Sequence, residues 1–250
     1  EWAESVEDIP TVFSPMARLI RPRRLDGSVL LAEDSPDNQR LISLYLRRTG
    51  ARVTLAEDGR QAVEQALEGD FDLVLMDMQM PVLDGPDATA LLRATGFGRP
   101  IVALTANASV EDRERCQAVG CNDFLTKPVD WEQFYRVMAS YLPEAAQEET
   151  SFLPPIAGLA ELTEDPEYQA MADRFLRECP ERVAELRQVI YQRNWEEVRR
   201  LAHRLKGVAG GLGMPELGSL AGDMEFQAIR GAGNEVAVLL ESMECWCHPS

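Results

Sequence analysis

Two kinds of apolar pattern divide this chain of 250 residues. Between residues 28 and 142, short apolar runs alternate with longer amphipathic stretches. From about residue 159 onward, apolar side chains recur every three or four positions, which is the spacing of an amphipathic helix. The first pattern predicts strands separated by helices, and the second predicts helices alone.

The apolar runs of the first part are too short for helices and lack polar alternation, as in strands that are buried on both faces. They lie at residues 29–32, 53–55, 73–76, 101–104 and 124–125. Helical patterns follow them at residues 37–49, 60–68, 87–95, 110–119 and 131–141. Five strand–helix units in alternation predict an α/β fold, with a parallel, doubly wound sheet covered by helices on both faces.

The second part predicts an all-α antiparallel helical bundle. Its apolar stripes begin at Tyr168, Val198, Leu217 and Val236, and Pro180 is expected to kink or split the first of them. Proline-containing stretches flank the first part of the chain. We therefore expect an N-terminal linker at residues 1–25, a first domain at 26–143, a second linker at 144–158 and a second domain at 159–248.

Composition excludes several classes of function. A formal net charge of -17 argues against a nucleic-acid partner, because phosphate backbones require clustered Lys and Arg. No apolar stretch approaches 18 residues, so we expect no direct membrane contact from this segment. The five cysteines form no C-x-x-C pair, which favours a reducing compartment such as the cytoplasm. The sequence opens at Glu1 rather than Met, and we interpret it as an excised fragment.

Reactive side chains follow four of the five predicted strands, at Glu33-Asp34, Asp77, Thr105 and Lys127. The carboxyl ends of parallel strands meet at one edge, where open α/β sheets bind ligands. Three carboxylates at this edge would repel one another without a cation, and a hard, oxygen-preferring ion that partners phosphate is Mg²⁺. The pattern predicts a site that places a phosphoryl group on a carboxylate, with Asp77 as the nucleophile. The alternative is that each Asp is an ordinary helix cap or turn residue.

Lysine is rare in the chain, with two residues against 23 arginines. Lys127 ends the last predicted strand, and Lys206 follows His203 by three positions. The ammonium group of lysine is a compact point charge on a flexible stem, which suits a single phosphoryl oxygen. Both lysines are therefore candidates for binding a phosphoryl group.

Helical geometry turns His203 away from the apolar stripe of its own helix. Lys206, Gly207 and Gly210 share its face, and a helix face without side chains lets a large partner approach closely. A neutral imidazole can attack phosphorus near pH 7, and Lys206 can neutralise the phosphoryl charge. The alternative is an ordinary surface histidine.

Two resemblances to known families follow from these motifs. Glu33-Asp34, Asp77 within the run from Met76 to Gly85, Thr105-Ala106 and Lys127-Pro128 resemble the receiver domain of response regulators, over about residues 26–143. The run from Ala202 to Gly207 around His203, followed by Gly211-Leu212-Gly213, resembles the histidine phosphotransfer (HPt) domain, over about residues 159–247.

The receiver resemblance implies a flavodoxin-like, five-stranded sheet of order 2-1-3-4-5, with Asp77 as the phosphorylated residue. It implies that Mg²⁺ is held by Asp34, Asp77, the backbone carbonyl of Gln79 and, through water, Glu33. It also implies that Thr105 and Lys127 bind the acyl phosphate and that Phe124 is the switch aromatic. The HPt resemblance implies that His203 is phosphorylated, and Gly207 and Gly210 are expected to bare its docking face.

The two domains together predict a phosphorelay module of two-component signal transduction, as at the C-terminus of a hybrid sensor histidine kinase. Asp77 would receive a phosphoryl group from an upstream histidine kinase domain, and His203 would pass it to or from a downstream response-regulator receiver. The chain shows no ATP-binding motif, so it is expected to move phosphoryl groups without generating them. We expect it in the cytoplasm, free or tethered through an upstream sensor region. The alternative is a non-catalytic docking or dimerisation module with vestigial phosphorylation.

Overall fold

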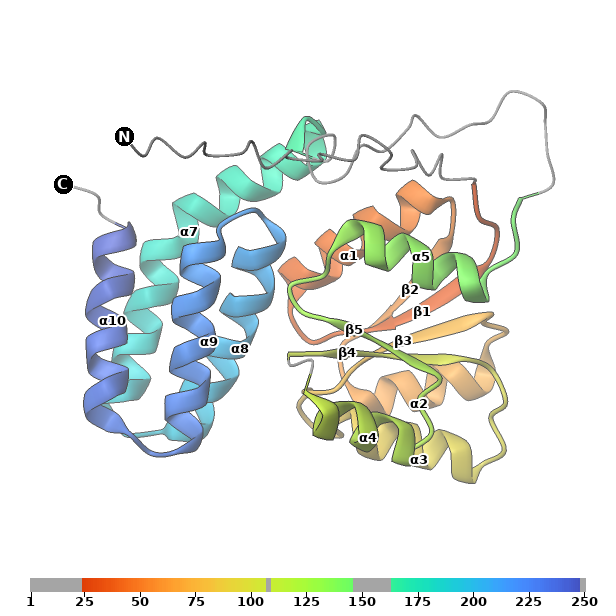
Figure 1. Cartoon of the computed structure of the whole chain (residues 1–250), viewed down its shortest axis with the longest axis horizontal. Helices are drawn as coiled ribbons and strands as arrows, with labels where there is room; N and C mark the ends of the chain where they lie inside the picture. The colour runs from red at the N-terminus through yellow and green to blue at the C-terminus, as the bar shows by residue number, and fades with distance from the viewer. Residues whose placement is uncertain (1–23, 107–108, 146–162, 248–250) are drawn as a thin grey trace, which may run out of the picture.

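The structure is a computed structural model, and it describes residues 24–106, 109–145 and 163–247. The strands of the first domain are β1 (Ser28–Ala32), β2 (Arg52–Ala56), β3 (Leu73–Asp77), β4 (Ile101–Thr105) and β5 (Asp123–Thr126). All pair in parallel, in the order β2-β1-β3-β4-β5 (Figure 1). The predicted sheet and its strand order are confirmed.

Helices cover both faces of this sheet (Figure 1). They are α1 (Pro36–Thr49), α2 (Gly59–Glu68), α3 (Gly85–Ala94), α4 (Val110–Ala118) and α5 (Trp131–Tyr141). One apolar cluster joins α1 and α5 to the sheet, and inside it Tyr45 contacts Trp131 and Phe134 edge to face. A second cluster joins α2 and α3 to the opposite face. Helices therefore pack against both faces of the sheet, and this packing fixes the positions of the side chains at its strand ends.

One expectation about the strands is wrong. β2 lies at the edge of the sheet, and most of its residues are partly or fully exposed, including Leu55 at 43%. Its apolar run does not indicate burial on both faces, because the helices that cover the sheet leave the side chains of this edge strand partly exposed. Leu25 lies at the end of the expected N-terminal linker, yet it packs into the core of the first domain. Leu25 is buried, and its N–H donates to the carbonyl of Thr49.

The second domain is a bundle of helices, as predicted. They are α7 (Pro166–Tyr191), α8 (Trp195–Gly211), α9 (Pro215–Ile229) and α10 (Gly233–Cys247). Pro180 does not split the first of them, since α7 runs without interruption past it. Cys179 and Val183 are buried on either side of the proline, so packing against the bundle continues across it.

The bundle lies against the carboxyl end of the sheet, with α7 and α8 next to α1 (Figure 1). Arginines of both domains form ion pairs across this boundary. Arg47 and Arg48 of α1 bind Glu167 and Asp165 at the start of α7, while Arg182 of α7 binds Asp37 at the start of α1. Of these pairs, Arg47–Glu167 is exposed, and an exposed pair contributes about 0.2–1 kcal/mol.

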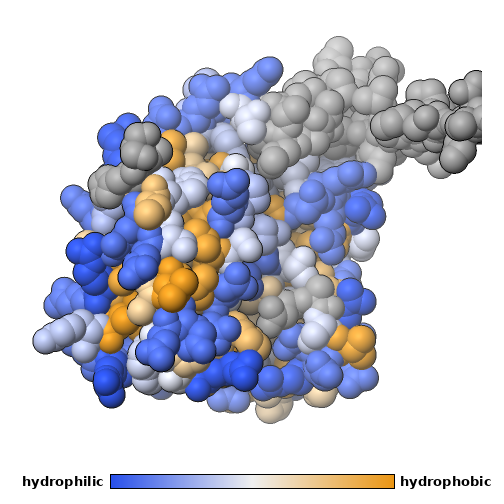
Figure 2. Space-filling view, turned by 60° about the vertical axis from the view of Figure 1, so that its left-hand side comes forward, coloured by the Kyte–Doolittle hydropathy of each residue, from blue (hydrophilic) through white to orange (hydrophobic). Residues whose placement is uncertain are grey.

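Within the described part of the chain, no helix combines the length and the apolar character that crossing a bilayer requires. Figure 2, in which the bundle comes forward, shows a band of apolar groups bordered by charged ones. The large apolar side chains exposed on the bundle are Leu176, Tyr191, Phe226, Ile229 and Val238.

Candidate functional site

Three carboxylates gather where β1 and β3 end. One oxygen each of Glu33, Asp34 and Asp77 lies within 4.8 Å of the others. Glu33 and Asp77 are fully buried, because β1 and β3 are adjacent central strands. The turn after β1 is short, since Ser35 caps α1 and its own N–H donates to Glu33 Oε1 at 3.1 Å. The carboxylates that sequence predicts at this edge are therefore brought together.

Lys127 lies between two of these carboxylates. Its Nζ is 2.6 Å from Glu33 Oε2 and 2.7 Å from Asp77 Oδ2, and all three side chains are buried. Burial raises the pKa of Asp77 and the pKa of Glu33, the latter to about 7, against the opposing effect of the Lys127 ammonium. The two acidic groups also raise the pKa of Lys127 above its ordinary value, although burial opposes them. The single ammonium of Lys127 therefore does not neutralise all the negative charge of the carboxylate cluster.

The cluster fits a hard divalent cation. Asp34 Oδ1 is buried and has no hydrogen-bond partner among the described residues. A buried, bare carboxylate oxygen is unfavourable unless a cation or donor reaches it. Carboxylate oxygens are the ligands that Mg²⁺ prefers. Glu33, Asp34 and Asp77 would hold the ion, whose chemistry is to neutralise charge on phosphoryl oxygens.

The other residues predicted for this edge lie around the cluster. The backbone N–H of Gln79 donates to Asp77 Oδ1 at 3.2 Å. Thr105 is buried at the end of β4, and its carbonyl accepts the N–H of Lys127 at 2.7 Å. Phe124 is half-buried, with the guanidinium of Arg113 4.6 Å above its ring. Their proposed roles in metal binding, phosphate binding and switching stay predictions.

His203 of α8 reaches the same site from the second domain. Its Nε2 is 4.0 Å from Asp77 Oδ1. This nitrogen is buried and has no hydrogen-bond partner among the described residues. Sequence places His203 on an outward face of its own domain, yet it is only 3% exposed, because the first domain covers that face. The two residues predicted to carry phosphoryl groups thus face one another.

The other ring nitrogen binds Glu225, a residue that the sequence analysis did not assign to the site. His203 Nδ1 is 2.9 Å from Glu225 Oε1. Burial alone would raise the pKa of the Glu225 carboxyl, but its hydrogen bond to His203 and the nearby cations hold it below its ordinary value. An ionised carboxylate only accepts, so Nδ1 carries a proton, and in the neutral ring the lone pair lies on Nε2. The signal in the sequence is an acidic residue inside the buried stripe of α9.

Gly207 and Gly210, which are expected to bare the docking face of His203, lie where the two domains touch. A Cβ on Gly207 would be 2.8 Å from Asn38 Nδ2, and one on Gly210 would be 2.5 Å from Cβ of Pro128. Both distances are shorter than real side chains allow. Lys206 also crosses the boundary and donates to the carbonyl of Ala106 at 3.1 Å.

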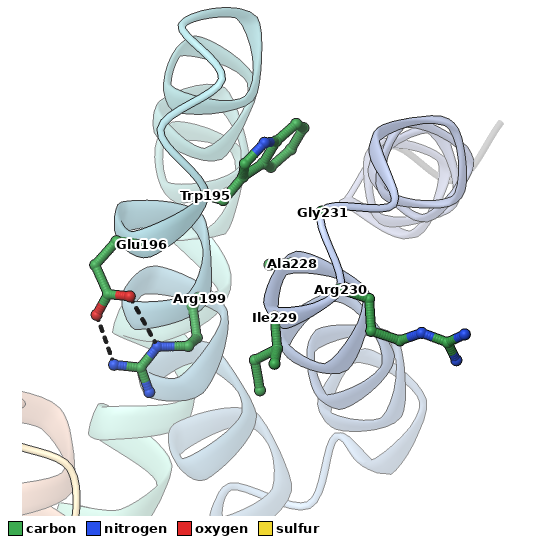
Figure 3. A pocket seen from close by; sticks show the side chains of 7 residues that line it. All are labelled: Trp195, Glu196, Arg199, Ala228, Ile229, Arg230 and Gly231. Atoms are coloured by element: carbon green, nitrogen blue, oxygen red, sulfur yellow. Dashed lines mark hydrogen bonds and ion pairs between the residues drawn. The ribbon is translucent and has the colours of Figure 1, made fainter.

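A separate pocket of about 640 Å³ opens between the start of α8 and the end of α9 (Figure 3). Its lining includes Trp195, Ile229 and Arg230, none of which is a predicted site residue. Arg199 connects it with the interface, since its guanidinium binds Glu196 and also donates to Gln79 Oε1 at 3.1 Å. We assign no phosphoryl chemistry to this pocket.

Sequence comparison agrees with the two domains that the structure shows. Residues 29–139 match the response regulator receiver domain, and residues 170–245 match the Hpt domain. The chain therefore contains a receiver domain followed by an Hpt domain, which are the domains of a phosphorelay module.

The match to one curated relative spans both domains, and the match to another spans about half of the chain. The signal transduction histidine-protein kinase BarA of Escherichia coli is 28% identical over 234 residues, which is 85% of this chain and 25% of BarA. The sensor protein GacS of Pseudomonas syringae is 40% identical over 118 residues, 45% of this chain and 13% of GacS. This chain thus spans a quarter or less of these relatives. A solved receiver domain of the sensor histidine kinase PA1611 of Pseudomonas aeruginosa, with magnesium in its active site cleft, is 46% identical. The match covers 46% of this chain and 97% of the PA1611 receiver domain, with a TM-score of 0.44.

Proposed function

We propose that Asp77 accepts a phosphoryl group and exchanges it with His203 of the same chain. The observation that carries this proposal is the 4.0 Å separation between Asp77 Oδ1 and His203 Nε2 in the docked domains. A gap of this size is one that a single phosphoryl group bridges. Holding donor and acceptor in register removes much of the entropic barrier to their reaction.

The exchange balances with the groups in place. The lone pair on Nε2 attacks the phosphorus of the acyl phosphate, forming an N–P bond, while the P–O bond to Asp77 breaks. Its electron pair stays on the Asp77 oxygen and restores the carboxylate. The imidazole ring becomes cationic, and Glu225, which accepts the Nδ1 proton in a hydrogen bond, stabilises that charge. The reverse reaction uses the same atoms in the opposite order.

Charged groups around the gap support the same assignment. Lys127 donates to Asp77 Oδ2, and Mg²⁺ at Glu33, Asp34 and Asp77 would neutralise further phosphoryl charge. Preorganised cations are the main source of catalysis in phosphoryl transfer, since the transition state is loose and highly charged. Lys206 is held beside Ala106, next to the site, and supplies a further positive charge there.

The proposed partners follow from the kinds of domain present. An upstream histidine kinase domain, in the same or another chain, supplies phosphoryl groups to Asp77. A response-regulator receiver exchanges them with His203. We place the chain in the C-terminal part of a hybrid sensor histidine kinase, working in the cytoplasm. The similarity to BarA and GacS over the matched regions supports this placement.

The test follows label from acetyl phosphate with Mg²⁺ in the intact chain, in Asp77→Asn and in His203→Gln. Phosphohistidine is stable in base and labile in acid, whereas an acyl phosphate is labile in base. We expect both kinds of label in the intact chain, only acyl phosphate in His203→Gln and neither in Asp77→Asn. Chelation of Mg²⁺ should prevent labelling.

Protein concentration separates exchange within a chain from exchange between chains. In the intact chain, label should reach His203 with a rate constant that does not depend on protein concentration. A mixture of Asp77→Asn with labelled His203→Gln should transfer more slowly, at a rate that rises with concentration. Equal, concentration-dependent rates in both would contradict exchange within the chain. Absence of any label would instead favour a docking module with vestigial phosphorylation.

Glu225→Gln tests the positioning of the imidazole. The variant removes the carboxylate that fixes the Nδ1 proton and stabilises the cationic ring, so we expect transfer to His203 to fall by roughly tenfold or more. Labelling of Asp77 should not change, because Glu225 does not contact the receiver carboxylates. Asp223→Asn, an exposed change on the same helix, is the matched control. Transfer at the normal rate in Glu225→Gln would show that the hydrogen bond is only structural.

A further inference from the structure

Arg204 carries a charge from the Hpt domain into the carboxylate cluster of the receiver. Its Nε and Nη2 both donate to Asp34 Oδ2, at 2.9 and 2.5 Å. The Asp34 side chain is 3% exposed, so this pair is largely withdrawn from water. Charged hydrogen bonds in such surroundings are strong, and neither partner is left unpaired without a large penalty. Arg204 follows His203 directly, so the docked state that brings the imidazole to Asp77 also brings this cation to Asp34.

We propose that Arg204 makes docking of the Hpt domain sensitive to both Mg²⁺ and phosphorylation. On this proposal, Mg²⁺ and Arg204 oppose one another at Asp34 while Asp77 is unphosphorylated, and they act together once Asp77 carries a phosphoryl group. The inference rests on the proposed function, because it assumes that Asp77 is the phosphorylated residue.

The charges of the cluster give the sign of this coupling. Three carboxylates and the one ammonium of Lys127 leave two negative charges when all acidic groups are ionised. A divalent cation balances them, and the guanidinium of Arg204 then adds an excess positive charge. Mg²⁺ bound to the unphosphorylated receiver should therefore weaken the Asp34–Arg204 pair, and by reciprocity docking should weaken Mg²⁺ binding.

Phosphorylation of Asp77 reverses the sign of the coupling between Mg²⁺ and Arg204. A phosphoryl group replaces the single charge of Asp77 with about two negative charges. One negative charge then remains after Mg²⁺ is bound, and Arg204 neutralises it. The geometry of Asp34 allows both cations at once, since Arg204 uses Oδ2 and leaves the buried Oδ1 bare. The Hpt domain is thus held while there is a phosphoryl group to exchange, and it is released after the group has left.

The experiment measures Mg²⁺ affinity calorimetrically on the whole, unphosphorylated chain and on Arg204→Gln. We expect the variant to bind Mg²⁺ roughly five- to tenfold more tightly, which is within the usual range of coupling between sites. Arg187→Gln is the matched control, since Arg187 pairs with Glu244 inside the bundle and should leave the affinity unchanged. These measurements involve no transfer, so they can fail while exchange between Asp77 and His203 is intact.

A distance measurement between probes on the two domains completes the test. In the wild-type chain, Mg²⁺ alone should lower the docked fraction, and Mg²⁺ with beryllofluoride, which occupies the place of a phosphoryl group, should restore it. In Arg204→Gln the docked fraction should be lower without Mg²⁺ and respond to neither addition. Unchanged Mg²⁺ affinity in Arg204→Gln, or tighter docking of the wild-type chain with Mg²⁺ alone, would overturn the proposal.

Discussion

A Gly210→Leu chain is expected to take up a phosphoryl group on Asp77 at the normal rate and to pass it to His203 about a hundredfold more slowly. Even a Cβ at this position would be 2.5 Å from one atom of the Pro128 ring and 2.6 Å from another. The ring is rigid, so the domains themselves must separate. Misplacing reacting groups by about 1 Å is enough for a hundredfold loss.

The control for this prediction uses other glycines of the same domain. Gly222→Ala adds a Cβ that meets Lys206 at 3.4 Å, an ordinary contact, and should transfer normally. Gly207→Leu should behave like Gly210→Leu, because Asn38 is buried and its amide donates to Glu33 Oε1, so it has little freedom to move aside. Helicity should be preserved in all of them, since leucine and alanine favour helices over glycine. Normal transfer in Gly210→Leu would mean that the docking face lies elsewhere.

Lys127→Met should produce the largest loss of stability. Lys127 is the buried cation between Glu33 and Asp77, and its removal leaves two carboxylates without a counter-charge. Breaking a buried pair in this way lowers the free energy of unfolding by about 3–5 kcal/mol. Urea unfolding, with hydrogen exchange in β1 and β3 to resolve the receiver, measures the loss. Arg52→Met, which removes an exposed partner of Asp26, should cost at most about 1 kcal/mol.

The loss in Lys127→Met should grow with pH. Glu33 already has a pKa of about 7 in the folded protein, against an ordinary value of 4.5. Between these values the folded state binds more protons than the unfolded state, so the free energy of unfolding falls as pH rises through this window. Without the ammonium the pKa values of both acidic groups rise further, and the penalty extends above pH 7. Mg²⁺ should restore part of the stability at pH 8. A loss independent of both pH and Mg²⁺ would show that packing, not charge, is what Lys127 provides.

The sequence predicts the sheet and the carboxylate cluster well, because both depend on local rules. Buried parallel strands are continuous apolar runs, and polar residues directly after them meet at one edge. Asp77 and Lys127 can therefore be placed at this edge without any knowledge of tertiary contacts. The edge strands β2 and β5 are the exceptions, since their apolar residues do not show that they lie at the edges of the sheet.

What the sequence does not predict is the arrangement between the domains. Periodicity places His203 on an outward face, but it cannot show that the receiver covers that face. Glu225 and Arg204 are two further cases. Each is an ordinary charged residue in a helix, and each gains its place in the site only when α9 or the receiver is packed against α8.

The burial of His203 limits the access of other receiver domains to its imidazole. A second receiver cannot reach the imidazole while the chain's own receiver covers it, so the two compete for one face of α8. Because both domains belong to one chain, the internal competitor acts at a high effective concentration. On the proposed function, a downstream receiver must compete with this internal receiver and gains access only when the two domains of the chain separate. The output of the module would then be governed by how long its two domains remain apart, rather than by the chemistry of either one.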